Sequence, residues 1–252
     1  MNIHVVDHYE SMSQLSATKI IEAVTSRSKI TLGLATGATP LRTYELLIND
    51  HKLNGTSYKN VTTFNLDEYV GVKRLSKESY YSYMKKKLFH SIDVEEDNIF
   101  IPNGMASNLQ EECNRYEQMI TNRCGIDLQI LGIGENGHIG FNEPGTNFSS
   151  HTHIVELTDS TKNANAQYFD KPTQMPTHAI TMGIATIMNA REIMLLATGS
   201  RKANAIYEVL HGKVTNLIPA TILQQHPNVT IIVDRDAYSL CETYERTKRY
   251  VR

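Results

Sequence analysis

Short apolar runs rich in β-branched residues alternate with longer amphipathic stretches along this chain of 252 residues. That alternation is typical of β-α-β units, in which helices join neighbouring parallel strands. We therefore expect an α/β fold with an open, mostly parallel sheet and helices on both faces. The predicted strands are residues 30–35, 61–66, 98–101, 128–133, 178–181, 193–198 and 229–233, and the predicted helices include 11–26, 40–50, 107–123, 200–211 and 219–225.

No internal repeat or low-complexity linker divides the chain, so residues 1–252 are expected to form a single domain. The stretch from about 146 to 176 is less regular and rich in Thr, Asn and Ser. Two interpretations are open for it, a lid over an active site or a long surface connection. The basic run 85–87 and the basic tail 246–252 are interpreted as solvated surface.

Composition narrows the class of protein. With 40% hydrophobic and 21% charged residues, the chain can bury a full core, and its net charge of −2 makes nucleic acid an unlikely partner. The start of the chain lacks the pattern of a secretory leader, and no apolar run reaches the roughly 20 residues that span a bilayer. Three widely spaced cysteines form neither a disulfide framework nor a zinc pattern. A cytoplasmic location without membrane contact is expected.

Ligands of open parallel sheets bind beyond the carboxyl ends of the strands, so the residues after each predicted strand carry the candidate chemistry. After the first of these strands come Thr36, Gly37, Ala38 and Thr39, followed by Pro40 and a helix. A glycine turn that leads into a helix start offers free backbone N–H groups to an anion. The alternative is an ordinary turn with a capping threonine.

The second strand leads into Asp67 and Glu68. Adjacent acidic residues at a strand end are often solvated loop residues. The other interpretation is that Asp67 points into the crevice as an acid/base group, with a pKa raised by burial and by its acidic neighbour.

After strand 128–133, the segment 132–137 matches G-x-G-x-x-G, and Glu156 follows at about the distance of a ribose-binding acid. A dinucleotide site requires a helix to begin within this motif. The chain continues instead with glycine, asparagine and Pro144-Gly145, which do not build such a helix. The segment is therefore interpreted as a glycine-lined loop.

This loop concentrates Asn136, His138 and Glu143 among small residues. His138 is the side chain whose ordinary pKa lies near neutrality, and Asn136 or Glu143 could orient its ring. The alternative is a loop that only hydrogen-bonds itself. One histidine and one glutamate are too few to predict a metal site.

Five segments, in one order over nearly the whole chain, resemble glucosamine-6-phosphate deaminases. The most specific is the middle one, which continues from Gly-His-Ile to Phe-Asn-Glu-Pro. The segments are LGLATGATP (32–40), FNLDEYVG (64–71), GIGENGHIGFNEPG (132–145), LATGSRKA (196–203) and PATILQQHPN (219–228).

The resemblance implies a modified Rossmann-like fold and conversion of glucosamine 6-phosphate and water to fructose 6-phosphate and ammonia, without a metal or other cofactor. By position, Asp67 resembles the base that moves a proton between carbons 2 and 1, and His138 the group that opens the sugar ring. Asn136 and Glu143 resemble the residues that orient the histidine. The positions that resemble the phosphate-binding residues are Thr36, Gly37, Ala38, Thr39 and Lys202.

Three positions depart from the family pattern. Asn136 stands where many members have aspartate, and we interpret this as tuning of the histidine. Gln167 stands where a phosphate-binding arginine is usual, so weaker phosphate binding is expected. His153 and Val155 replace basic residues of the effector site in allosterically regulated members, which argues against that activation. Both monomers and hexamers occur in the family, so a homo-oligomer stays an open possibility.

Two other functions were weighed. A 6-phosphogluconolactonase would have Asp-Glu-Arg in place of the segment 67–69 and would lack Phe-Asn-Glu-Pro. A sugar-phosphate sensor of a transcription regulator would carry a helix-turn-helix in front of the fold, and the first predicted strand of the phosphate site already begins at residue 30. Amino-sugar deamination is the expected function.

Overall fold

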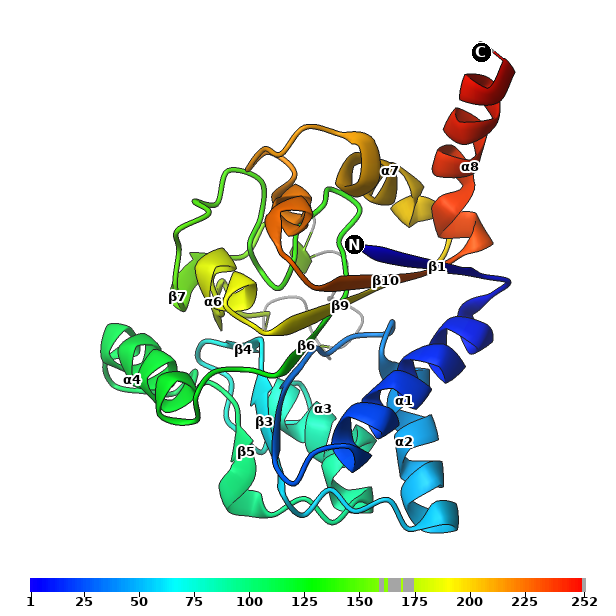
Figure 1. Cartoon of the computed structure of the whole chain (residues 1–252). Helices are drawn as coiled ribbons and strands as arrows, with labels where there is room; N and C mark the ends of the chain where they lie inside the picture. Colours follow the sequence, from blue (N-terminus) through cyan, green and yellow to red (C-terminus); the bar gives the residue numbers. More distant parts are fainter. Residues whose placement is uncertain (159–160, 163–168, 170–174, 251–252) are drawn as a thin grey trace.

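The computed structural model describes the chain apart from residues 159–160, 163–168, 170–174 and 251–252. A seven-stranded parallel sheet with the order β1-β10-β9-β6-β2-β3-β5 forms its centre (Figure 1). These strands are β1 (Asn2–Val6), β2 (Ile30–Leu34), β3 (Val61–Asn65), β5 (Ile99–Phe100), β6 (Leu128–Leu131), β9 (Glu192–Ala197) and β10 (Val229–Asp234).

Helices cover both faces of this sheet, as the sequence pattern predicts. In β9, Met194 and Leu196 pack into one hydrophobic cluster, whereas Ile193 and Leu195 pack into another. Successive side chains of a strand point to opposite faces, so the two clusters are the two sides of one sheet. The first cluster is closed by α1 (Tyr9–Thr25), α2 (Leu41–Asn54) and α3 (Tyr80–Lys87), and the second by α4 (Leu109–Asn122), α6 (Ile184–Met188), α7 (Ala203–His211) and α8 (Arg235–Tyr250).

Local sequence sets several helix ends. Asn108 begins α4 by accepting hydrogen bonds from the backbone N–H groups of the next turn, and Ser79 begins α3 in the same way. Gly55 ends α2 in the left-handed conformation, with φ of 75°. These caps satisfy polar backbone groups that the helices cannot satisfy internally.

A second sheet stands beside the first. It is three-stranded and antiparallel, with the order β4 (Asp67–Tyr69), β8 (His178–Thr181) and β7 (His153–Glu156). The strand predicted at 178–181 therefore exists, but the expectation that it joins the parallel sheet was wrong. A short apolar run indicates a strand without showing which partner it pairs with.

Other elements were not predicted at all, namely β1, β4, β7, α3, α6 and α8. The helix predicted at 219–225 is a 3-10 helix, η6 (Pro219–Gln225), and three shorter ones are η1 (Phe89–Ser91), η2 (Glu96–Asn98) and η5 (Ser200–Lys202). The predicted lid at 146–176 includes β7, but much of it lies outside the described residues.

Candidate active site

Asp67 reaches its position through the junction between the two sheets. β3 ends at Asn65, and β4 begins at Asp67, which pairs with Thr181 of β8. The backbone N–H of Leu66 donates to Leu34 at the end of β2 (3.1 Å), which fixes the chain at this crossing. Asp67 therefore lies at the carboxyl edge of the parallel sheet, where ligands of such folds bind.

Asp67 and its neighbour Glu68 are both buried but differ in their partners. The Glu68 carboxylate accepts hydrogen bonds of 2.9 Å from the backbone N–H of Tyr69 and from those of the first two residues of α3. Burial raises the pKa of Glu68, while these hydrogen bonds lower it in part. Burial, and then the charge of Glu68, raise the pKa of Asp67 to about 8. A carboxyl group in this state can exchange a proton near neutral pH.

The loop after β6 holds His138 with two of its own side chains. The Asn136 amide donates to Glu143 Oε2 (2.7 Å), and Asn136 Oδ1 accepts from the backbone N–H of His138 (3.2 Å). Nδ1 of His138 lies 3.5 Å from Glu143 Oε2, a distance of charge attraction and longer than a good hydrogen bond. The imidazole also packs closely on Gly134, where a side chain would collide with the ring.

Glu143 is held from its other side by threonines that follow β7. Thr161 Oγ1 donates to Glu143 Oε1 (2.6 Å), and Thr158 Oγ1 lies 3.3 Å from the same atom. Burial raises the pKa of Glu143, but the nearby His138 imidazole and the hydrogen bonds from Thr161 and Asn136 outweigh it and lower the pKa to about 2. Glu143 is thus a fixed negative charge beside the histidine.

Gly140 brings this loop against Asp67. Its φ is +58°, and a methyl group placed there would lie 3.7 Å from Asp67 Oδ2 and 3.0 Å from Thr181 Oγ1. The same hydroxyl accepts a hydrogen bond from the backbone N–H of Phe141 (3.1 Å). The loop that carries His138 and the strand that carries Asp67 therefore meet here.

The predicted phosphate loop, 36–39, follows β2 and leads into α2. Gly37 has φ of +91° with open space where a side chain would lie. Thr36 contacts the half-buried Tyr80. The Tyr80 hydroxyl donates to that of Tyr69 (3.0 Å), and the charge of Asp67 acts on it. This aromatic pair therefore connects the loop to Asp67.

Lys202, on η5, is half-buried and lies near Glu135 of the His138 loop. Burial lowers the pKa of its ammonium group. Within the described part of the chain, no hydrogen bond joins Lys202 to the loop 36–39. An anion between them would restore favourable surroundings to this cation.

Several residues at this site gave no recognisable sequence signal. Tyr80 and Thr161 reach it from other segments of the chain. They are recognised as site residues only because they contact predicted ones, Thr36 and Glu143 respectively. Gln167, predicted at the phosphate site, lies outside the described residues. His153 and Val155 lie on β7.

Two absences concern the described residues only. They contain no group of three or more His, Cys, Asp or Glu side chains placed to hold a metal ion. None of their helices is long and apolar enough to cross a membrane.

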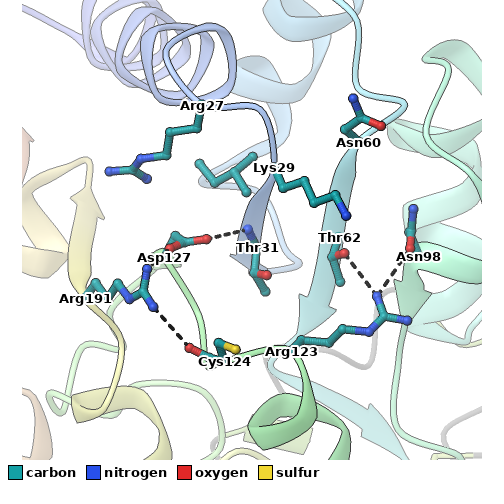
Figure 2. Close-up of a pocket in the computed structure, with 11 residues that line it drawn as sticks. Arg27, Lys29, Thr31, Asn60, Thr62, Asn98, Arg123, Cys124, Asp127 and Arg191 are labelled. Carbon is teal, nitrogen blue, oxygen red and sulfur yellow. Dashed lines mark hydrogen bonds and ion pairs between the residues drawn. The ribbon is translucent and has the colours of Figure 1, made fainter.

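A hollow of about 630 Å³ lies at the opposite, amino edge of the sheet (Figure 2). Its rim carries Arg27, Lys29, Arg123 and Arg191, and Arg191 pairs with Asp127 at 2.8 Å. α1 and α4 end at this edge, and cations near helix C-termini offset the negative end of the helix dipole. The basic side chains of this hollow therefore have a structural role at the helix ends. None of the predicted site residues lines it.

Comparison with known proteins gave one family model, glucosamine-6-phosphate isomerases/6-phosphogluconolactonase, which matches residues 6–232. A protein of Halalkalibacterium halodurans named glucosamine-6-phosphate deaminase is 59% identical over 237 residues, covering 94% of this chain and 96% of its own. One of Shouchella clausii with the same name is 54% identical, covering 95% and 97%.

Two solved structures complete the comparison. A monomeric glucosamine-6-phosphate deaminase has a TM-score of 0.93 and 44% identity, covering 95% of this chain and 100% of its own. A 6-phosphogluconolactonase from Trypanosoma cruzi has a TM-score of 0.74 and 21% identity, covering 94% and 96%. The second likeness shows a shared fold.

Proposed function

The chain belongs to the family of glucosamine-6-phosphate isomerases and 6-phosphogluconolactonases, and we propose that Asp67 and His138 carry out its reaction. That reaction is the deamination of glucosamine 6-phosphate, the activity for which its relatives of 54–59% identity are named. The chain is thus an enzyme of amino-sugar metabolism, and we place it in the cytoplasm.

One observation carries the assignment of residues. Asp67, buried and with a pKa of about 8, lies against Gly140 of the same loop that holds His138 beside Glu143. Two candidate proton carriers of different character are therefore carried by backbone segments that meet at Gly140, at the carboxyl edge of the sheet. A reaction that moves protons first on oxygen and then on carbon requires such a pair.

His138 opens the sugar ring. Its imidazole takes the proton from the hydroxyl on carbon 1 and returns it to the ring oxygen, giving the open aldehyde. Glu143 stabilises the imidazolium that forms during this transfer, and Asn136 holds the Glu143 carboxylate in place.

Asp67 then moves a proton between neighbouring carbons. As a carboxylate it removes the proton from carbon 2 while the oxygen on carbon 1 takes a proton from the substrate ammonium group, leaving a neutral enolamine. Asp67 then gives its proton to carbon 1, leaving an iminium ion at carbon 2. Water adds to that carbon and ammonia leaves, giving fructose 6-phosphate. The positive amino group of the substrate favours the ionised form of Asp67 while it is bound.

The substrate phosphate binds between the loop of Thr36, Gly37, Ala38 and Thr39 and the Lys202 ammonium. The loop supplies backbone N–H groups at the start of α2, and Lys202 supplies charge. All these groups come from one chain, so the scheme does not depend on whether the protein forms a homo-oligomer.

The function is tested by incubating the purified protein with glucosamine 6-phosphate and measuring both products. We expect ammonia and fructose 6-phosphate in equal amounts, without added nucleotide. The shared fold makes 6-phosphogluconolactone the proper comparison substrate. Hydrolysis of that lactone with no ammonia from the amino sugar would overturn the proposal.

A further inference from the structure

Two tyrosines from separate helices form hydrogen bonds with backbone carbonyl groups of the predicted phosphate loop. The hydroxyl of Tyr83, on α3, donates to the carbonyl oxygen of Gly37 (2.6 Å). The hydroxyl of Tyr9, the first residue of α1, donates to the carbonyl oxygen of Ala38 (2.9 Å) and accepts from the backbone N–H of Arg42 (3.1 Å). Two consecutive carbonyl groups of the loop are therefore fixed by side chains distant in sequence.

These contacts determine where the loop's N–H groups point. In a trans peptide the C=O of one residue and the N–H of the next point in opposite directions. When Tyr83 holds the Gly37 carbonyl, the N–H of Ala38 points away from α3. When Tyr9 holds the Ala38 carbonyl, the N–H of Thr39 points away from α1.

The N–H groups of this loop are available to a ligand. Among the residues that the structure describes, none accepts a hydrogen bond from the backbone N–H of Gly37, Ala38 or Thr39. Three consecutive free donors before a helix form a cradle for an anion.

The loop needs such support because of its glycine. Gly37 has φ of +91°, and glycine adopts positive and negative φ values about equally readily, so glycine alone does not fix this conformation. If the peptide between Gly37 and Ala38 turned over, a carbonyl oxygen would face the phosphate in place of an N–H. Donor would become acceptor, and the anion would be repelled.

The geometry points to Tyr9 and Tyr83 as positioning residues that hold the backbone of 36–39 in its phosphate-binding orientation. This inference rests on the proposed function, since it concerns the same phosphate site. Both hydroxyls bond to backbone groups and neither moves a proton in the scheme above, so their loss should weaken substrate binding and spare the chemical steps.

The test compares Tyr83→Phe and Tyr9→Phe with Tyr81→Phe. Tyr81 lies on the same helix as Tyr83, and its hydroxyl donates to Glu96 (3.0 Å), outside the loop. For Tyr83→Phe and Tyr9→Phe we expect KM for glucosamine 6-phosphate and the inhibition constant of inorganic phosphate to rise together by about threefold to tenfold, the worth of one hydrogen bond. Their kcat should change by less than about twofold, and Tyr81→Phe should match the wild type in all three constants.

Direct titration with inorganic phosphate, followed through the amide NMR signals of Gly37 and Ala38, separates this inference from the proposed function. Weaker phosphate binding in Tyr83→Phe and Tyr9→Phe supports it even if the wild type fails to release ammonia. Unchanged phosphate binding in both variants, or an equal loss in Tyr81→Phe, would overturn it while leaving the deaminase activity in place.

Discussion

At the scale of single residues, the adjacent carboxylates Asp67 and Glu68 have different uses because their surroundings differ. Glu68 accepts backbone N–H groups and fixes the start of α3 against β4. Asp67 is also buried but lacks that set of donors, so nothing replaces the hydration that its carboxylate loses. Its pKa therefore rises to about 8. Glu68 thus has a structural use, whereas the raised pKa of Asp67 suits the proton transfer proposed for it.

This burial predicts a pH-dependent cost in stability. Between the ordinary pKa of 3.8 and the folded value of about 8, folded Asp67 keeps a proton that the unfolded chain has released. Stability then falls as pH rises through this window, and an asparagine at 67 removes the effect. In urea unfolding, we expect the advantage of Asp67→Asn over the wild type to grow by at least about 1 kcal/mol from pH 5 to pH 8. An advantage that stays constant would show that Asp67 is ionised throughout.

Glu143 differs from Asp67 because its surroundings stabilise its negative charge, and its substitution is expected to affect turnover. Glu143→Gln keeps the size of the side chain but removes the charge beside His138, and its single amide oxygen can accept from only one of Asn136 and Thr161. We expect kcat to fall by about 10-fold to 100-fold, below the full value of an acid–base group, because the histidine itself remains.

Glu117→Gln is the matched control for that variant. Glu117 also accepts threonine hydroxyls, from Thr152 and Thr186, and also lies 3.5 Å from a histidine, Nδ1 of His151. It should leave kcat within about twofold of the wild type. An equal loss of kcat in both variants would show that the effect comes from a general loss of structural stability and not from the charge beside His138.

At the scale of elements, the site depends on the contact between β4 and the loop 132–145. A side chain at Gly140 would enter that contact, whereas one at Gly71, φ +80°, would meet open space. Both alanine substitutions add the cost of a positive φ, about 1 kcal/mol. We expect only Gly140→Ala to lower kcat, by about tenfold or more, because the new methyl group crowds Thr181, the residue that pairs with Asp67 across the second sheet. Similar kcat in both, measured by ammonia release, would contradict this contact.

The elements also show what the sequence could predict. Strands such as β2, β6, β9 and β10 are apolar runs buried on both faces, so their pattern is visible without any partner. β4 is three residues long, too short to show a periodicity, whereas α8 is amphipathic and its helical period was overlooked in a segment whose end was interpreted only as a basic tail. The second sheet was missed because antiparallel pairing between distant segments leaves no local signal.

The same limit holds for the site. Asn136, His138 and Glu143 lie within eight residues of one another, and the structure brings them together, but their predicted orienting and catalytic roles stay predictions. Thr161 and Tyr80 reach the site only through the fold. Predicted roles for the phosphate loop and Lys202 stay predictions, as does the effect of Gln167.

At the scale of the whole molecule, the parallel sheet assigns different tasks to its two edges. The carboxyl edge gathers Asp67, the His138 loop and the N–H groups of 37–39, which no described residue accepts. The amino edge carries arginines near the ends of α1 and α4 (Figure 2). In parallel β-α-β units the strand ends converge from segments far apart in sequence. The loop of His138 comes to this edge directly after β6, and Asp67 comes to it where the chain leaves β3 for the second sheet.

The most direct test of this account is turnover of glucosamine 6-phosphate by the wild type and by Asp67→Asn across pH 6 to 9. Only ionised Asp67 can act as the base, so wild-type kcat/KM should rise with pH and level off above about 8. Asp67→Asn should bind the substrate in a direct titration yet release ammonia about 100-fold to 10,000-fold more slowly. Near-normal ammonia release from Asp67→Asn would contradict the account, because another group would then move the proton between carbons 2 and 1.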